Sequence, residues 1–348
     1  MPKNPPPKTS LARSPRATGR ATLADVARAA GVSPITVSRA LRGTRAVAAE
    51  LTARVTQAAS ELGYVPDPAA RALASRRSAQ VVVLIPKLSN TLFVELLDAV
   101  QASLLPAGYQ TLIGVTHYDP VEEEAVLRSF LLHRPAGLIV TGLDRSPEAA
   151  RLIAASGVPC VHVMEVAAEP GSYSVGFSQA AAGRAMTQRL LDSGRRRIVF
   201  VGAQLDPRTL QRAAGYELAM QAAGLAGDAR KVLCESPSSM ALGAALFEQV
   251  LSEMPDVDAI FFCNDDLAQG ALMAALRLGL AVPARVAVAG FNDLPGSDQM
   301  LPTLSTVRTP RSAIGSQAAR MLMALMQGES VSEPHLDLGF EIIQRGSS

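Results

Sequence analysis

Side chains that could contact nucleic acid lie close together near the N-terminus. Thr36, Ser38 and Arg39 are separated by at most one residue, and their hydroxyl and guanidinium groups can donate hydrogen bonds to bases and phosphates. An arginine can also pair with guanine through two parallel hydrogen bonds. This cluster predicts DNA binding if one helix presents the three side chains together.

The surrounding residues 23–41 predict two short helices joined by a turn. Gly31 supplies a permissive backbone for the turn, Ser33 can cap the second helix, and Pro34 suits the first turn of that helix. The first helix has apolar residues at spacings of three and four, namely Leu23, Val26, Ala27 and Ala30. The pattern indicates a helix-turn-helix motif, whose second helix enters the major groove. An ordinary helical hairpin is the alternative.

Two neighbouring features favour the DNA-binding interpretation. A third amphipathic stretch, Glu50 to Leu62, would close a three-helix core and end at Gly63. Residues 1–80 carry 13 lysines and arginines against 4 acidic residues, whereas the rest of the chain carries 20 against 27. Positive charge is therefore concentrated at the end that holds the motif, as phosphate binding requires.

Length and cysteine usage constrain the class of protein. The 348 residues exceed one typical domain and predict two or three folded units. Cys160, Cys234 and Cys263 are odd in number and lie in apolar runs, so we expect buried, reduced thiols in a cytoplasmic, nucleoid-associated protein. No apolar run reaches membrane-spanning length. Residues 1–20 are basic and proline-rich without a signal peptide's apolar core, and we expect a disordered arm.

The larger part of the chain alternates short β-branched runs with amphipathic helical stretches. Such alternation predicts parallel sheets covered on both faces, and two sets of runs predict two doubly wound lobes. A ligand would bind in the cleft at the carboxyl ends of the strands. The runs are 81–86, 109–115, 136–142 and 158–164, followed by 197–203, 231–235, 259–265 and 286–293. The helical stretches expected between them include Leu92–Leu104, Glu122–Leu132, Ala180–Ser193, Arg212–Ala223, Met240–Glu253 and Leu267–Leu278.

The chain after residue 20 resembles the lactose-repressor (LacI/GalR) family. That family carries VA..AGVS..TVSR.L, then ELGY.P and a short hinge ending in leucine, in the order and spacing seen here. Within the family the resemblance is greatest to gluconate-operon repressors, through PKLSNTLFVELL, VGAQLDPRTLQRAAGYELAM and FCNDDLAQGA. It implies an all-α helix-turn-helix head at 21–66, a hinge at 67–79, and an α/β two-lobed periplasmic-binding-protein-like domain for effector binding and dimerisation at 80–348.

The resemblance implies a set of DNA-contacting residues. Pro34, Ile35 and Arg39 match the family's base-reading positions, and the first two offer only apolar surface, which suits thymine methyl groups. The hinge segment Asp67–Ser75 would form a short helix when two copies meet on DNA, and Leu73 would then wedge into the minor groove. Asp67 departs from the family's usual asparagine. The full expected set is Thr22, Leu23, Ser33, Pro34, Ile35, Thr36, Ser38, Arg39 and Leu73.

The resemblance also implies an effector cleft between the lobes. Arg212 stands where relatives carry an effector-contacting arginine shortly before a glycine-aromatic pair; a solvent-exposed arginine at a helix start is the alternative. Asn292 stands where many relatives carry an aspartate, and its neutral amide would repel an anionic ligand less. The expected lining is Ser89, Asn90, Phe93, Arg145, Arg208, Arg212, Asn264 and Asn292.

Several of these residues have a structural interpretation as well. Arg145 and Arg208 could each be surface residues. Asn264 is expected to face the effector from the end of its strand, while Asp265 or Asp266 caps the following helix, with Asp266 favoured. Ser178-Gln179 replaces the family's usual Asp-Asn pair, so the family's role for that pair is not carried over to it.

These observations predict a homodimeric repressor that binds a pseudopalindromic operator and responds to a sugar acid such as gluconate. A neutral sugar or a nucleoside is the alternative effector, and a sugar-binding transport protein is a further alternative for the large domain. An enzyme is not expected, because the four histidines lack metal-ligand spacing and no catalytic or phosphate-binding motif occurs. We expect no metal, no cofactor and no membrane partner.

Overall fold

The computed structural model describes residues 21–41, 47–65 and 78–348. The chain separates into two compact units, one within residues 1–76 and the other within residues 77–348. The expected disordered arm at 1–20, most of the hinge, and Leu73 lie outside the described residues. In the described ranges, no helix combines the length and apolarity needed to cross a membrane.

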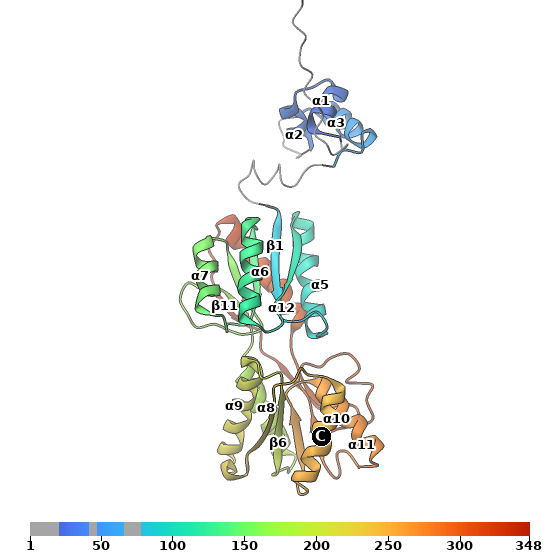
Figure 1. The fold of residues 1–348 in the computed structure, drawn as a ribbon, viewed down its shortest axis with the longest axis vertical. Helices are drawn as coiled ribbons and strands as arrows, with labels where there is room; N and C mark the ends of the chain where they lie inside the picture. Colours follow the sequence, from blue (N-terminus) through green and yellow to red (C-terminus); the bar gives the residue numbers. More distant parts are fainter. Residues whose placement is uncertain (1–20, 42–46, 66–77) are drawn as a thin grey trace, which may run out of the picture. The chain divides into compact units, whose positions relative to one another are not determined.

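The first unit contains three helices within its described residues (Figure 1). Thr22 caps the first helix by accepting a hydrogen bond from the backbone N–H of Asp25, and the Asp25 carboxylate accepts one from the backbone N–H of Thr22 in return. Gly31 ends that helix in the left-handed conformation, with φ of 65°. The helices are α1 (Leu23–Ala30), α2 (Pro34–Leu41) and α3 (Ala49–Glu61). Their buried residues form one small core, so the expected three-helix head is confirmed.

The second unit has two lobes, each built on a parallel sheet. The first sheet has the strand order β11-β5-β4-β3-β1-β2. Five consecutive residues of β1, from Val81 to Ile85, are buried, because helices cover both faces of a parallel sheet. Its strands are β1 (Gln80–Ile85), β2 (Gln110–Val115), β3 (Gly137–Thr141), β4 (Cys160–Val163), β5 (Ser174–Gly176) and β11 (His335–Asp337).

The second lobe has the strand order β7-β6-β8-β9. These strands are β6 (Ile198–Ala203), β7 (Arg230–Cys234), β8 (Ala259–Phe262) and β9 (Ala287–Ala289). A short antiparallel pair, β10 (Thr306–Arg308) and β12 (Glu341–Ile343), accompanies the two sheets. The expectation of two doubly wound lobes is confirmed.

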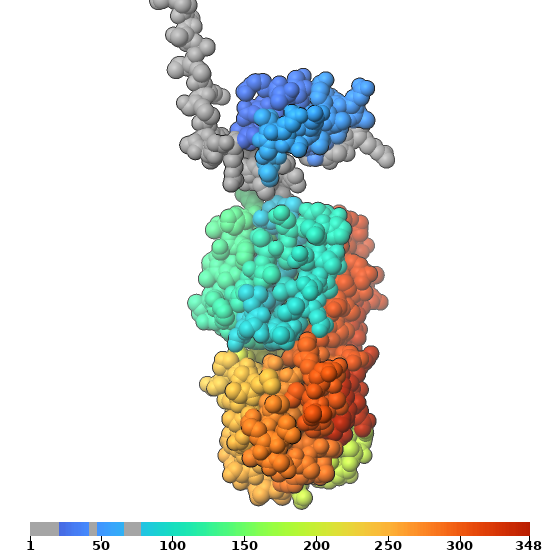
Figure 2. All heavy atoms as spheres, turned by 90° about the vertical axis from the view of Figure 1, so that its right-hand side faces the viewer, coloured from blue at the N-terminus to red at the C-terminus, as the bar shows by residue number. Residues whose placement is uncertain are grey.

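Helices cover both sheets, and one of them returns late in the sequence. The first lobe carries α5 (Leu92–Leu104), α6 (Pro120–Leu132), α7 (Pro147–Ser156) and α12 (Arg311–Gln327). The second carries α8 (Gln179–Asp192), α9 (Pro207–Ala222), α10 (Met240–Glu253) and α11 (Asp265–Arg277). Because α12 packs on α5, β3 and β4, the C-terminal part of the chain belongs to both lobes, as the red segments in Figures 1 and 2 show.

The sequence predicted many of these elements, but it did not predict that the C-terminal part of the chain returns to the first lobe. Two expected helices, Leu92–Leu104 and Met240–Glu253, have the predicted ends. The helix expected to start at Arg212 begins five residues earlier, at Pro207, with Asp206 as its cap. Helices α7 and α12 were not predicted.

Candidate functional site

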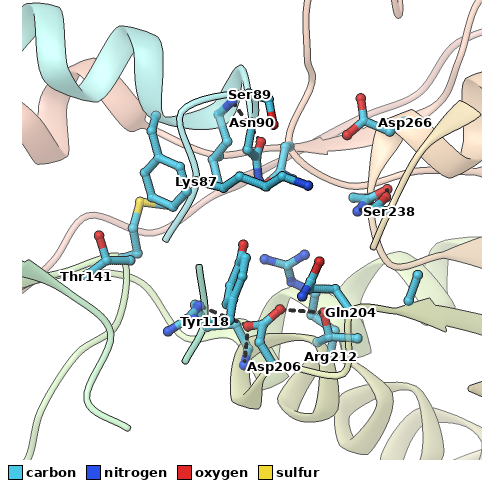
Figure 3. Close-up of a pocket in the computed structure, with 18 residues that line it drawn as sticks. Lys87, Ser89, Asn90, Tyr118, Thr141, Gln204, Asp206, Arg212, Ser238 and Asp266 are labelled. Atoms are coloured by element: carbon cyan, nitrogen blue, oxygen red, sulfur yellow. Dashed lines mark hydrogen bonds and ion pairs between the residues drawn. The ribbon is translucent and has the colours of Figure 1, made fainter. Parts of the chain in front are cut away.

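A polar cavity lies between the two lobes, at the carboxyl ends of the strands. Each strand from β1 to β4 and from β6 to β9 sends its end or the loop after it to the cavity wall, as expected for an α/β sheet. The cavity holds about 710 Å³ of empty space, part of it open to solvent. It is lined by Lys87, Ser89, Asn90, Leu92, Phe93, Tyr118, Thr141, Met164, Ala203, Gln204, Asp206, Arg208, Thr209, Arg212, Ser238, Asn264, Asp266 and Asn292 (Figure 3).

Arg212 of α9 lies on the second-lobe side of this cavity. Its Nε donates to Oε1 of Gln179 (2.8 Å) and its Nη1 donates to the carbonyl oxygen of Cys263 (2.6 Å). The guanidinium carbon lies 3.8 Å from the ring centroid of Phe291. Burial lowers the pKa of Arg212, while the nearby Asp206 opposes that shift. The side chain is thus fixed by the protein, and Arg212 is not the solvent-exposed arginine of the alternative interpretation.

Gln179 has a positioning role that the sequence did not suggest. Its Oε1 holds Arg212, and its Nε2 donates to the carbonyl oxygen of Met164 (2.9 Å). The residue is buried at the first turn of α8, where Ser178 is the helix cap. Gln179 therefore connects the cavity arginine of one lobe to the loop after β4 of the other.

Arg208 also reaches the cavity, but carboxylates surround its guanidinium. It forms ion pairs with Asp144 (2.9 Å), Glu165 (3.1 Å) and Asp206 (3.0 Å). Burial opposes its charge, and the three carboxylates outweigh burial, so the pKa of Arg208 is raised. Asp144 and Glu165 follow β3 and β4 of the first lobe, whereas Arg208 belongs to α9 of the second. The cluster therefore connects the two lobes.

Asn264 is the cap of α11, which corrects the expectation for Asp266. Oδ1 of Asn264 accepts from the backbone N–H of Leu267 (3.1 Å), and its Nδ2 donates to Oγ of Ser238 (2.8 Å). Asn264 was predicted to face the effector, and it does line the cavity. Asp265 is fully buried and accepts hydrogen bonds from residues of the second lobe, and burial raises its pKa to about 6. Asp266 lines the cavity instead of capping the helix.

Asn292 presents a buried amide oxygen without a hydrogen-bond partner among the described residues. The residue is 3% exposed and lines the cavity. Its φ of 108° is in the region that favours glycine, and its carbonyl oxygen accepts from Nη1 of Arg311. Tyr118, Met164 and Gln204 of the cavity wall also have positive φ. Strained backbone of this kind is typical of ligand sites.

The first-lobe side of the cavity is formed mainly by the loop between β1 and α5. Ser89, Asn90 and Phe93 all line it, as predicted, and Phe93 is 2% exposed. Lys87 of the same loop and Tyr118 after β2 also line it and were missed. Burial, with Asp206 nearby, raises the pKa of Tyr118 to about 12. Lys87 could have been found from its place two residues after the end of the buried strand β1.

Arg145 does not line this cavity. Its side chain is 5% exposed and its Nε lies 2.9 Å from Glu123. Its Nη1 and Nη2 donate to the carbonyl oxygens of Gly142 (2.7 Å) and Thr141 (2.9 Å). It lines a smaller neighbouring cavity in which Arg208 also takes part. Arg145 is therefore the one expected effector residue that does not line the cavity between the lobes.

The DNA-binding candidates of the first unit divide into two groups. Thr22, Ser33 and Thr36 use their hydroxyls within the head: Ser33 Oγ accepts from the backbone N–H of Thr36 (3.2 Å) and lies 2.9 Å from its hydroxyl. Leu23 packs against the small core. The exposed surface at the start of α2 includes Pro34 and Ile35, with Ile35 65% exposed, and Ser38 and Arg39 follow on the same helix.

The chain matches known proteins over nearly its whole length. Residues 22–67 match the family of bacterial regulatory proteins called lacI, and residues 187–348 match a periplasmic binding protein-like domain. The chain is 54% identical over 336 residues to the HTH-type transcriptional regulator GntR of Pseudomonas aeruginosa, which covers 97% of this chain and 98% of that protein.

Solved structures give the same match. The transcription regulator GntR from Chromobacterium violaceum is 47% identical with a TM-score of 0.75, covering 77% of this chain and 99% of its own. The lac repressor dimer bound to operator and the anti-inducer ONPF is 25% identical with a TM-score of 0.83, covering 94% of this chain and 99% of its own.

Proposed function

The chain belongs to the LacI family of bacterial regulatory proteins, and we propose that it is a repressor controlled by gluconate or a closely related sugar acid. In this proposal the effector binds the cavity between the lobes, and its binding releases a homodimer from a pseudopalindromic operator. The chain is a DNA-binding transcriptional regulator, as its match to the lacI family and to GntR shows.

The observation that carries the proposal is the preorganised Arg212. Its Nε and Nη1 are held by Gln179 and Cys263, and its face by Phe291, which leaves Nη2 without a partner in the described part of the chain. An arginine fixed in this way loses little entropy when it binds a carboxylate. The unpartnered amide oxygen of Asn292 accepts hydrogen bonds from hydroxyl groups without adding negative charge.

The proposed DNA binding uses α2 of two heads. One head reads few bases, and two-fold symmetry doubles the contacts. The solved lac repressor that resembles this chain is a dimer on its operator. Pro34 and Ile35 would contact thymine methyl groups, Arg39 would pair with guanine, and Leu73 would insert into the minor groove. Dimerisation would come from the large domain.

The proposed release of operator follows from the thermodynamic linkage between effector binding and DNA binding. The effector changes operator affinity only by its different affinities for the DNA-bound and free states of the dimer. Lobe closure around the sugar acid would alter the dimer interface and move the two hinge segments apart, because the first lobe follows the hinge directly in the chain.

A ligand screen tests the effector. Thermal shift with gluconate, ketogluconate and phosphogluconate, against neutral sugars and nucleosides, should show stabilisation by a sugar acid. Arg212→Ala should abolish most of that shift, while Arg184→Ala, an exposed arginine of α8, should leave it unchanged. Stabilisation by neutral sugars or nucleosides alone would refute the assignment, as would a gluconate shift that Arg212→Ala leaves undiminished.

Operator binding tests the DNA half of the proposal. Arg39→Ala should weaken binding by roughly 1–3 kcal/mol and relax one operator position, because a bidentate base contact is lost. A uniform loss across all sequences would make Arg39 a phosphate contact. Unchanged affinity in Leu73→Ala would exclude the minor-groove wedge, and a monomer that binds a symmetric operator fully would exclude the dimer.

A further inference from the structure

We propose that Lys87 of the first lobe and Arg212 of the second bind the same carboxylate of the effector, one from each side of the cavity. Lys87 would then select acids over neutral ligands and tie the first lobe to the bound effector. This inference rests on the proposed sugar-acid function and deepens it by naming a specificity-determining residue.

Lys87 is a cation that has no partner among the residues that the structure describes. It lies in the loop between β1 and α5, is half-buried, and lines the cavity. In the residues that the structure describes, its ammonium group makes no hydrogen bond and no ion pair. An ammonium has three donors and no acceptor, so only an anion or another acceptor can satisfy it. Lys231, the other lysine of the described ranges, pairs with Glu217 at the protein surface.

The other cavity cations are wholly or partly engaged. Arg208 is surrounded by Asp144, Glu165 and Asp206, so these carboxylates already neutralise its charge. Arg212 has one nitrogen left, its Nη2. In Figure 3, Lys87 reaches into the cavity from the first lobe, and Arg212 lies on the opposite side, on the second lobe. A carboxylate between them would receive donors from both lobes.

The charge of the cavity indicates a single carboxylate. Asp266 also lines the wall and has no hydrogen-bond or ion-pair partner within the described residues. The lining residues include three cations, Lys87, Arg208 and Arg212, and two carboxylates, Asp206 and Asp266. The lining therefore has one excess positive charge, which matches a monoanion. The Asp266 carboxylate, like the amide oxygen of Asn292, accepts hydrogen bonds from hydroxyl groups. The cavity therefore suits an acid with one carboxylate and a polyhydroxyl chain better than a sugar acid that also carries phosphate.

Because the two cations come from different lobes, the carboxylate can bind both only when the lobes are closed. Loss of Lys87 should therefore reduce effector affinity and raise the gluconate concentration that releases operator by the same factor, since both depend on the effector-bound state.

Isothermal titration of the full chain with gluconate tests the pair. Lys87→Met should weaken gluconate binding by about tenfold or more, the loss expected for one charge-assisted hydrogen bond. Lys87→Arg, which keeps the charge, should retain most of the affinity. Lys231→Met is the matched control and should bind as the wild type does. Melting temperatures without ligand should be the same for all four proteins.

The outcomes separate this inference from the proposed function. Wild type that binds no sugar acid overturns both. If the wild type binds gluconate and Lys87→Met binds it with an affinity within about twofold of the wild type, only the role of Lys87 is overturned. Equal losses of gluconate affinity in Lys87→Met and Lys87→Arg would also overturn that role, because they would indicate that Lys87 acts by packing. Phosphogluconate that binds more tightly than gluconate, with Lys87→Met losing only that preference, would assign Lys87 to a second anionic group and refute the shared carboxylate.

Discussion

Gly183 should be essential for the position of Arg212. Gly183 lies on α8 and faces the backbone of Arg212 on α9. A Cβ atom added there would touch the carbonyl oxygen of Arg212 and lie 2.9 Å from its Cα. Gly215 makes the reciprocal approach, since its Cβ would touch the carbonyl oxygen of Ala180 and lie 2.7 Å from the backbone nitrogen of Arg184. The two helices can pack this closely only because both residues lack a side chain.

The magnitude follows from two opposing effects of Gly183→Ala. Backbone atoms cannot rotate away as a side chain can, so the helices must separate, and overpacking of this kind costs about 1–3 kcal/mol. Alanine in a helix interior recovers up to about 1 kcal/mol of that cost. We expect a net loss of about 1–2 kcal/mol, or a fall of about 3–6 °C in the melting temperature of the large domain. Gluconate affinity should also fall, because Arg212 moves with α9.

Calorimetry of the full-length variant measures the first effect, and titration with gluconate measures the second. Gly227→Ala is the matched control, because a Cβ at Gly227 meets nothing within 4 Å and its φ is not in the left-handed region. That variant should melt at the wild-type temperature or slightly above it. A Gly183→Ala variant as stable as the control would refute the argument that these glycines set the approach of α8 to α9.

Two further perturbations test the charged groups of the large domain. Arg208→Met should destabilise the domain by about 3 kcal/mol or more in urea unfolding, because it leaves Asp144, Glu165 and Asp206 without their cation. Arg151→Met, which removes the cation of an exposed ion pair, should change stability far less. Equal losses in the two variants would contradict the role of the Arg208 cluster. His162→Gln should flatten the pH dependence of unfolding between pH 6.5 and 4. Burial and the nearby charge of Arg145, whose Nη1 lies 3.1 Å from Nδ1 of His162, outweigh the opposing contact with the carbonyl oxygen of Gly142 and lower the pKa of His162 to about 4. The unfolded state therefore binds a proton that the folded state excludes. The free energy of unfolding of the wild type should fall by up to about 3 kcal/mol as the pH falls through this range. A His162→Gln variant with the wild-type slope, or an equal effect of His133→Gln at an exposed position, would refute this prediction.

The sequence by itself determined the local elements and the class of protein. Helical spacing, the cap residue Ser33 and the turn residue Gly31 specify the head, because these signals act within one turn of helix. Buried strands such as β1 follow from continuous apolar runs, and parallel strands place their carboxyl ends at one edge. That rule, with the family resemblance, is enough to predict that Asn90, Phe93, Arg212 and Asn292 line the cavity, as they do.

Only the tertiary structure decided which distant residues meet. Periodicity carries no information on pairs such as Arg212 with Gln179, or Arg208 with Glu165, because these contacts depend on how two lobes and two crossing helices pack. The same is true of α12, which returns to the first lobe because its apolar face is buried there against α5. The tertiary structure also decided which residue caps α11. Asn264, Asp265 and Asp266 are consecutive in the sequence, but only Asn264 lies where its side chain can accept a hydrogen bond from a backbone N–H group at the start of α11. Asp265 is buried in the core, and Asp266 lines the cavity wall.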